Sequence, residues 1–429
     1  MWSNASWRAQ AAEKGLALHY GIITPPVAGH IRPFGALGCE LIARGHRVTL
    51  LQMEDVRERA FQEGLEFAAL GQSDHPPGSL TKSLQQLGAL SGLGALRFTI
   101  EAVRRTTEMF CRDAPEMARA CGIDCLLVDQ TEPAGGSVAE YLRIPFVTVC
   151  NALALNREPN VPPPFTGWAY RNSAWARARN SAGNAIYDRI MAPVMHVLTG
   201  WRRRWGLPAI RNPEDSFSPL AQISQLIRGF DVPRAQLPAN FTYTGPLRRP
   251  ASAEPFPWEE LDGRPMVYAS LGTLQHGKRD IFRCFAEACA PLDVQLVIAH
   301  NGGLDKDAVA ELPGHPIAVE FAPQTEVLSR ASLTLTHAGL NTVLDSLAAA
   351  VPIIATPITY EQPAIAARVR ASGAGVSIAL NRLNSALVRE NVRRMLGEKS
   401  WRDRACRLAN EIRQSGGATK AADVIETIG

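Results

Sequence analysis

The sequence lacks several features that would assign it to a common class of protein. No apolar run reaches the roughly 20 residues that a membrane-spanning helix needs. Neither a Walker A motif nor a G-x-G-x-x-G run occurs, which argues against a phosphate-cradling ATPase and a dinucleotide oxidoreductase. The eight cysteines include no C-x-x-C pair, so we expect reduced, mostly buried thiols in a cytoplasmic protein, without zinc or disulfides.

An excess of charge of one sign is also missing. The 45 basic and 41 acidic side chains leave a net charge of +4 and indicate no dominant basic face, so we expect no nucleic-acid partner. With 46% hydrophobic residues, the composition is that of a globular protein. Residues 1–15 have no apolar core of the signal-peptide type, and we expect them to form a flexible N-terminal extension.

Segments typical of strands and helices alternate twice along the chain. This pattern predicts an α/β protein with two parallel-sheet domains, and 429 residues also exceed what one core usually holds. A predicted helix at Pro33–Arg44 is begun by Pro33 and stopped by Gly45, and another spans Ala134–Leu142. The predicted strands are Leu16–Ile23, Arg47–Leu51, Cys125–Val128, Phe146–Val149, Met266–Ala269, Val294–Ala299, Ile317–Phe321, Leu333–Thr336 and Ile353–Ala355.

The segment from Phe321 to Gln362 carries polar residues where predicted strands end. Leu333–Thr336 is followed by a small-residue turn and then by a helical pattern beginning at Leu340. The N-terminus of such a helix points free N–H groups and its positive dipole end at the turn, which suits a pyrophosphate. After the next strand come Glu361 and Gln362, an acid and an amide suited to sugar hydroxyls.

The order and spacing of this segment resemble the donor signature of the UDP-glycosyltransferase family. That family has the GT-B fold, in which two Rossmann-like parallel-sheet domains face each other across a cleft. The resemblance implies that Phe321 stacks on the uracil in place of the usual Trp, and that Gln324 and Asp345, the latter in place of Glu, contact the ribose. The remaining implied donor-binding residues are Ala322, His337, Gly339, Asn341 and Thr342 at the base and pyrophosphate, and Glu361 and Gln362 at the sugar.

The same resemblance gives each part of the chain a role. Residues 16–243 would be the acceptor-binding domain and 266–410 the nucleotide-sugar domain, joined by a proline-rich linker at 244–265. The chain is expected to be mostly helical from 385 to 428, with residues 411–429 crossing back to the first domain.

A histidine and an aspartate follow predicted strands of the first domain. His30 comes after Leu16–Ile23 and Asp129 closes another strand, so both should reach the carboxyl edge of the sheet. A neutral imidazole can deprotonate an attacking alcohol while a carboxylate fixes its tautomer. Both positions match the base and its orienting acid in the family.

The run YASLGT at 268–273 follows a predicted strand of the second domain. Ser270, Gly272 and Thr273 could approach phosphate oxygens and stabilise the departing diphosphate. The D-x-D triplet at Asp305–Asp307 is interpreted as a helix cap instead of a metal site. We therefore expect no metal and no cofactor, and metal-independent, inverting transfer from UDP-glucose that leaves a β-glucoside.

Several runs in the first domain are similar to those of bacterial zeaxanthin glucosyltransferases. They include SDHPPGSLTKSL at 73–84 and ALALNREPNVPPP at 152–164, and they imply a carotenol acceptor. Asn156, Arg157 and Glu158 either shape the acceptor pocket or form a structural hairpin. Two alternatives stay open: a glycosyltransferase for a polyketide, a phenol or another lipophilic alcohol, and a non-catalytic binding partner built on this fold.

Aromatic and arginine side chains are interleaved between residues 168 and 205. Such a composition is typical of an interfacial surface, and one hypothesis is transient docking on an anionic membrane; the alternative is helices with buried Trp and solvated Arg. No pattern indicates an oligomeric state. The residues concerned are Trp168, Tyr170, Arg171, Trp175, Arg177, Arg179, Trp201, Arg202, Arg203, Arg204 and Trp205.

Overall fold

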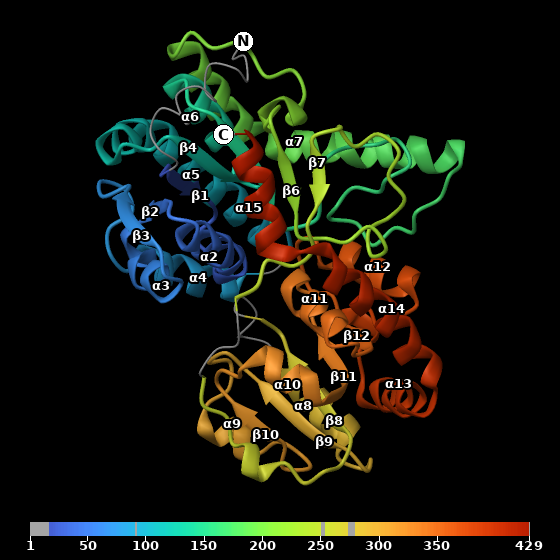
Figure 1. Cartoon of the computed structure of the whole chain (residues 1–429). Coiled ribbons are helices and arrows are strands. Elements are labelled where there is room, and N and C mark those ends of the chain that lie inside the picture. The colour runs from blue at the N-terminus through green and yellow to red at the C-terminus, as the bar shows by residue number, and fades with distance from the viewer. Residues whose placement is uncertain (1–16, 91, 250–253, 273–278, 429) are drawn as a thin grey trace.

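A computed structural model of the chain describes residues 17–90, 92–249, 254–272 and 279–428. It contains two α/β domains, one above the other in Figure 1. The N-terminal sheet has the strand order β3-β2-β1-β4-β5-β6-β7 and the C-terminal sheet the order β10-β9-β8-β11-β12-β13. Neighbouring strands are parallel in both sheets, which confirms the predicted fold class.

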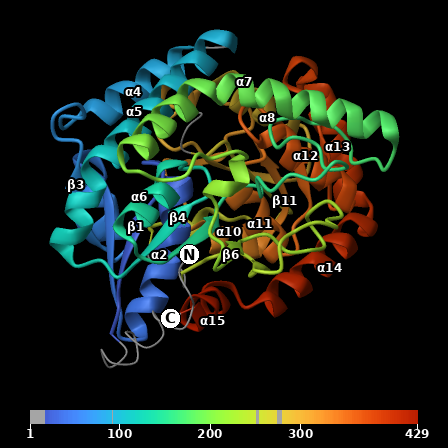
Figure 2. The ribbon, with the colours of Figure 1, turned by 90° about the horizontal axis from the view of Figure 1, so that it is seen from above.

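The N-terminal domain covers its sheet with long helices on both faces (Figure 2). Its strands are β1 (His19–Ile23), β2 (Arg47–Met53), β3 (Glu66–Leu70), β4 (Cys125–Asp129), β5 (Phe146–Cys150), β6 (Gln222–Ser224) and β7 (Phe241–Tyr243). Its helices are α2 (Ala28–Ala43), α3 (Arg57–Gln62), α4 (Ser79–Ala89), α5 (Gly92–Cys121), α6 (Ala134–Leu142) and α7 (Ala174–Arg204), with single 3-10 turns at Glu54–Val56 and Pro213–Ser216.

The C-terminal domain repeats this architecture with a smaller sheet. Its strands are β8 (Met266–Ser270), β9 (Gln295–Ala299), β10 (Ile317–Val319), β11 (Ala331–Thr336), β12 (Ile353–Ala355) and β13 (Gly375–Ser377). Its helices are α8 (Arg279–Cys289), α9 (Lys306–Ala310), α10 (Gln324–Arg330), α11 (Leu340–Ala348), α12 (Gln362–Ser372), α13 (Ser385–Gly397), α14 (Lys399–Ser415) and α15 (Gly417–Ile428), with 3-10 turns at Trp258–Glu260 and Leu380–Arg382. Every helix in the described ranges is too short or too polar to cross a bilayer.

The central strands are apolar throughout because helices cover both of their faces. All five residues of β1, β4, β5, β8 and β9 are buried, as expected for parallel strands inside a sheet. The chain order reverses between β1 and β4 and again between β8 and β11. Crevices form at such switch points, beyond the carboxyl ends of the strands, so both sheets offer ligand sites there.

Helix α2 begins earlier than its proline predicts. It starts at Ala28, five residues before Pro33, so His30 lies in the first turn of the helix and not in a loop ahead of it. Pro33 has no N–H to donate to the carbonyl of Gly29, four residues back. That carbonyl instead accepts a hydrogen bond from Asn341 Nδ2 of the other domain, at 2.7 Å. The helix therefore contains its proline without leaving a polar group unpaired.

The last helix returns to the first domain. In Figure 1, α15 lies beside α2, and Ala421 and Ile425 belong to the N-terminal core. Arg44 Nη1 donates to Asp423 at 2.7 Å and to Glu426 at 2.6 Å. The two sheets themselves run from His19 to Tyr243 and from Met266 to Ser377.

An apolar cluster and buried ion pairs join the two domains. Leu153 and Phe230 of the first domain pack with Leu344 and Ile365 of α11 and α12. Because this core is continuous between the domains, it fixes how the two sheets face each other across the cleft.

Candidate active site

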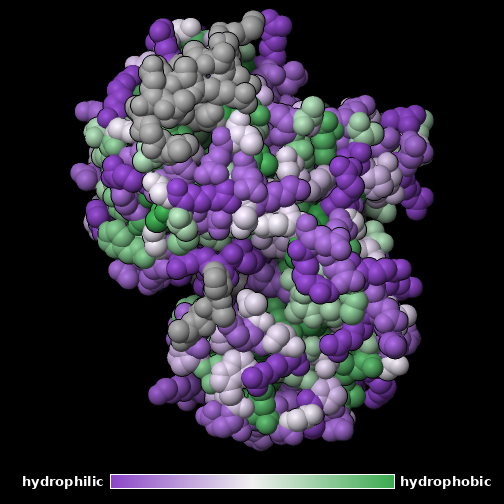
Figure 3. All heavy atoms as spheres, in the orientation of Figure 1, coloured by the Kyte–Doolittle hydropathy of each residue, from purple (hydrophilic) through white to green (hydrophobic). Residues whose placement is uncertain are grey.

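A cavity of about 910 Å³ lies between the domains. Its walls come from loops and helix starts that follow β1, β4 and β5 on one side and β8, β11 and β12 on the other. Figure 3 shows the outline of the molecule narrowing between the two lobes. The cavity therefore occupies both switch points at once.

His30 and Asp129 are brought together at the first switch point. His30 Nδ1 lies 2.8 Å from Asp129 Oδ2, and because a carboxylate only accepts, Nδ1 carries the hydrogen and Nε2 the lone pair. Asp129 is fully buried and also accepts from Thr24 at 3.2 Å, Asn151 at 3.0 Å and Thr131 Oγ1 at 2.6 Å. The imidazole is thus held in one tautomer with Nε2 available to a substrate.

The contact between His30 and Asp129 raises the pKa of the histidine and lowers the pKa of the aspartate. Burial lowers the pKa of His30, but the Asp129 charge and hydrogen bond outweigh it, and Glu361 adds to them, so the pKa of His30 is raised. Burial raises the pKa of Asp129, yet the His30 charge and the hydrogen bonds from His30 and Thr131 lower it overall. Asp129 therefore stays ionised, and Glu361 of the second domain lies near enough to affect His30.

His337 lies between two glycines at the second switch point. A Cβ on Gly339 would come within 2.5 Å of the ring, and one on Gly272 within 2.8 Å, so neither position admits a side chain without displacing the ring. Burial lowers the pKa of His337 to about 4, although a hydrogen bond with the Ser270 backbone opposes the shift. The ring is neutral near pH 7 and therefore has a single N–H, and a hydrogen bond that raises its pKa is one in which the ring donates to the Ser270 backbone.

The N-terminus of α11 opens into the cavity beside His337. Its N-cap residue, Gly339, provides no side-chain cap, so the first N–H groups of the helix are free for a ligand. Thr342 lines the cavity, and so does Asn341. The amide of Asn341 is partly committed, because it donates to Gly29 and its Oδ1 accepts from Gln225 at 3.2 Å.

The residues implied for the nucleoside lie together. Gln324 Nε2 donates to Asp345 Oδ2 at 2.6 Å, and Tyr268 donates to Gln324 Oε1 at 3.2 Å. Phe321 is 43% exposed and lines the cavity with Ala322. This arrangement combines an aromatic face with a carboxylate that can accept from ribose hydroxyls.

The residues implied for the sugar lie at the start of α12. Gln362 Oε1 accepts from the N–H groups of Ile358 at 2.8 Å and Thr359 at 2.9 Å, which leaves its NH₂ group for a ligand. Glu361 and Tyr360 line the cavity, and Tyr360 has a φ of 54°. A non-glycine residue in this left-handed region is strained, as is common in ligand-binding loops.

Of the three residues predicted to approach the phosphates at the end of β8, the structure describes two. Ser270 and Gly272 line the cavity, and Gly272 has a φ of 68°, which favours glycine. Thr273 lies outside the described residues.

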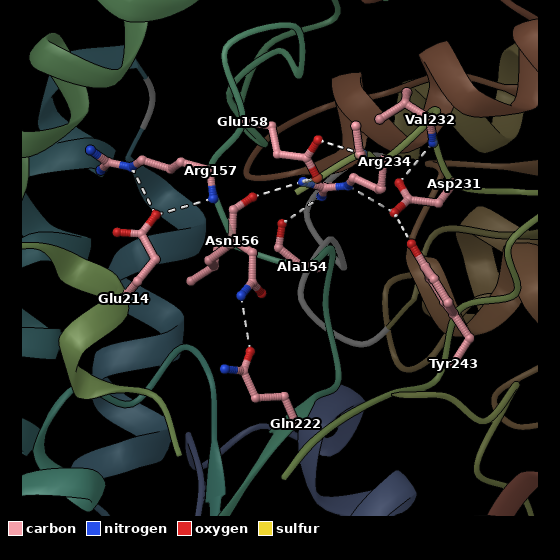
Figure 4. Close-up of polar contacts among 12 residues, drawn as sticks. Ala154, Asn156, Arg157, Glu158, Glu214, Gln222, Asp231, Val232, Arg234 and Tyr243 are labelled. Carbon is pink, nitrogen blue, oxygen red and sulfur yellow. Dashed lines mark hydrogen bonds and ion pairs between the residues drawn. The ribbon is translucent and has the colours of Figure 1, made fainter. Parts of the chain in front are cut away.

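Asn156, Arg157 and Glu158 do not line the cavity. Figure 4 shows them in a polar network in which Asn156 donates to Gln222 at 2.9 Å. Glu158 accepts from the N–H of Ala235 at 2.7 Å, and Arg157 pairs with Asp188 at 2.5 Å. Of the two interpretations of this run, the described contacts match the structural one and give no support to an acceptor pocket.

The acceptor side of the cavity is largely apolar. Helices α4 and α5 contribute most of this wall, and none of the residues by which these two helices line the cavity is acidic, although Glu63 and Glu132 line it nearby. Its apolar residues are Leu80, Leu84, Leu87, Phe98, Ala102 and Val103.

Several members of the Trp- and Arg-rich segment are paired with one another or with the core. Arg202 is 5% exposed and bonds Glu140 Oε2 at 2.9 Å, while Trp205 stacks on Tyr141 with ring centroids 4.6 Å apart. Arg179 lies over Trp168, 4.6 Å from the ring centroid. Arg202 therefore does not face a membrane, whereas Trp175 of the same segment is 68% exposed, and docking of the segment as a whole stays a prediction.

Asp305 caps a helix, as predicted. It is the N-cap of α9, and its side chain accepts from the N–H of Ala308 at 2.9 Å. Among the described residues, no three His, Cys, Asp or Glu side chains lie close enough together to hold a metal ion.

Three cavity residues escaped sequence analysis. Arg248, in the segment predicted to be a linker, pairs with Asp345 and lies 3.2 Å from Gln225. Asn151 orients Asp129, and Tyr360 lines the sugar side. Arg248 and Asn151 act through partners that are distant in sequence, so no local pattern reveals them, whereas Tyr360 directly precedes the predicted residue Glu361.

Comparison with known proteins assigns the family. Residues 284–427 match the family model described as "Erythromycin biosynthesis protein CIII-like, C-terminal domain". The zeaxanthin glucosyltransferase of Pantoea ananas is 38% identical over 417 residues, covering 96% of each chain. That of Pseudescherichia vulneris is 36% identical over 413 residues, covering 95% of this chain and 97% of the relative.

The chain belongs to the UDP-glycosyltransferase family. Solved structures agree with the fold of this glycosyltransferase. SnogD from Streptomyces nogalater superposes with a TM-score of 0.71 at 21% identity, covering 96% of this chain and 100% of the other. The calicheamicin glycosyltransferase CalG4 gives a TM-score of 0.71 at 24% identity, covering 96% and 98%. The predicted GT-B fold is confirmed.

Proposed function

We propose that this glycosyltransferase transfers glucose from UDP-glucose to a hydroxyl of an apolar alcohol, a carotenol such as zeaxanthin, with inversion at the anomeric carbon. The observation that carries the proposal is the 2.8 Å contact between His30 and Asp129 across the cavity from the donor-side residues. This pair is what a poorly acidic alcohol needs in order to attack.

The reaction proceeds in one displacement. His30 Nε2 takes the proton of the acceptor hydroxyl as its oxygen attacks the anomeric carbon from the face opposite the diphosphate. The bond from that carbon to the diphosphate oxygen breaks, and its electron pair leaves with UDP. Asp129 stabilises the imidazolium that forms, so the α-linked donor yields a β-glucoside.

Groups of the second domain would stabilise the negative charge that develops on the departing UDP. The free N–H groups at the start of α11 would donate to the diphosphate oxygens, and His337 lines the cavity beside them. Gln362 and Glu361 would hold the sugar hydroxyls. These donors form a metal-independent means of leaving-group stabilisation, which is the mechanism that we propose.

The acceptor class rests on two observations. The relatives at 38% and 36% identity are zeaxanthin glucosyltransferases, and the acceptor wall is lined by leucines, Phe98 and Val103. Another lipophilic alcohol would fit the same wall. A relative at 26% identity, the 4'-demethylrebeccamycin synthase of Lentzea aerocolonigenes, is named for a different product, so acceptors differ among the proteins that this chain resembles.

The test is a transfer assay with mass detection. The purified protein is incubated with UDP-glucose and a panel of zeaxanthin, simple phenols and a macrolide in detergent, with chelator present. We expect one or two hexoses on zeaxanthin, and no product from His30→Ala. Transfer only to other alcohols would replace the carotenol, and UDP binding without any transfer would favour a non-catalytic protein.

A further inference from the structure

Helices α4 and α5 meet at a tip that exposes three leucines. Leu90 is 37% exposed, Leu93 72% and Leu96 38%. Figure 2 shows the two helices at the outer edge of the N-terminal domain. We call Leu90, Leu93 and Leu96 the leucine tip. Large apolar side chains rarely gather on a surface without an interaction partner.

The charge around the leucine tip is of one sign. No Asp or Glu occurs between Asp74 and Glu101, a stretch that contains Lys82 and Arg97. Both are exposed, and neither forms an ion pair with the described residues. Exposed leucines flanked by unpaired cations complement an anionic lipid surface, because the apolar groups enter the acyl region while the cations meet head groups.

The leucine tip continues into the acceptor wall. Leu87 on α4 and Phe98 on α5 line the cavity, three residues from Leu90 and two residues from Leu96 along the chain. A carotenol that left a bilayer at the tip would therefore lie beside an end of the wall whose apolar residues include Leu84, Leu87 and Phe98.

We propose that the leucine tip inserts into an anionic lipid bilayer and that the acceptor enters the cavity from there. The second half of this inference rests on the proposed function; the first does not. A second copy of the chain is a weaker occupant, since three leucines offer far less than the about 1,200 Å² that a stable protein interface buries. The unpaired cations would also face each other in a symmetric dimer.

The experiment is co-sedimentation of the full chain with vesicles. One set contains phosphatidylcholine alone, and the other contains one part phosphatidylglycerol to two parts phosphatidylcholine. We compare the wild type, the triple variant Leu90→Ser, Leu93→Ser, Leu96→Ser, and the control Ile186→Ser, whose isoleucine is 59% exposed on α7. The wild type and the control should bind anionic vesicles, and the triple variant should partition at least about tenfold less.

Two further readouts separate the possible causes. Turnover of detergent-dispersed zeaxanthin should be unchanged in the triple variant, whereas turnover of zeaxanthin supplied in anionic vesicles should fall. Wild-type protein that fails to sediment with anionic vesicles, or a triple variant that sediments equally well, overturns the proposal. So does a dimer that dissociates in the triple variant with vesicle binding unchanged. Failure to glycosylate any alcohol in detergent would refute the proposed function and leave the vesicle result to decide the docking surface.

Discussion

Proton transfer in this enzyme should depend on one imidazole. His30→Ala is expected to lower kcat by about 10²–10⁴-fold, the usual contribution of a general base, because no other group in the contact network of Asp129 could accept the proton. UDP affinity should be unchanged, since the donor-side residues lie in the other domain. Initial rates and calorimetric titration with UDP measure the two effects, and His196→Ala, on the exposed side of α7, is the control. Equal loss of both would give His30 a structural role.

The same imidazole predicts the pH dependence of the reaction. A protonated ring cannot take a proton, so kcat/KM should fall as the pH falls through the pKa of His30, which lies above the ordinary 6.5. Asp129→Asn removes the charge that raises this pKa, so the inflection should move to lower pH while kcat falls. A pH–rate profile of both proteins measures the shift. An inflection that stays in place in Asp129→Asn would assign it to another group.

At the scale of single elements, Pro33 leaves the Gly29 carbonyl at the start of α2 without a partner in the helix, so that this carbonyl can bond Asn341 of the other domain. Pro33→Ala restores an N–H that can bond the Gly29 carbonyl within the helix, in competition with Asn341. We expect kcat to fall a few-fold while thermal stability stays equal or rises, because proline disfavours a helix interior. Pro193→Ala, at a proline inside α7 and away from the cavity, is the matched control and should leave kcat unchanged. An unchanged kcat in Pro33→Ala would show that turnover does not depend on this contact.

The elements also show how far sequence reasoning reaches. Central strands such as β4 and β5 could be predicted because both faces are buried and their residues are uniformly apolar. The strands β6, β7 and β13 could not, because polar residues or glycine interrupt the apolar run of each, whereas β12 is equally short but apolar throughout. The donor-side residues between 321 and 362 could be predicted because they lie in one stretch of chain.

The contacts of residues whose partners are distant in sequence could not be predicted from the sequence. Asn156 contacts Gln222 and Arg248 contacts Asp345, which lie 66 and 97 residues away. The interpretation of Arg202 as membrane-facing failed for the same reason, because its partner Glu140 is 62 residues away. Composition alone does not say whether an arginine faces lipid or a carboxylate.

At the scale of the whole molecule, a buried charge cluster holds the domains together. Asp231 is fully buried and pairs with Arg368 of α12 at 2.8 Å and with Arg234 at 3.1 Å (Figure 4 shows Arg234). Asp231→Asn would leave two buried guanidinium groups short of a counter-charge, which typically costs about 3–5 kcal/mol. The urea midpoint should fall clearly in Asp231→Asn and stay unchanged in Asp262→Asn, whose partner Arg264 is exposed. Equal midpoints would mean that the cluster adds nothing to stability.

The hydrogen bond from Asn341 to Gly29 also joins the two substrates' sites. Its donor side chain belongs to the helix that would receive the diphosphate, and its acceptor carbonyl is next to His30 in sequence. Any motion that separates the sheets breaks this bond and frees a carbonyl in the first turn of α2. Opening of the cleft therefore also changes the hydrogen bonding of the helical turn that carries the base, so the donor-side helix and the turn around His30 respond to the same motion.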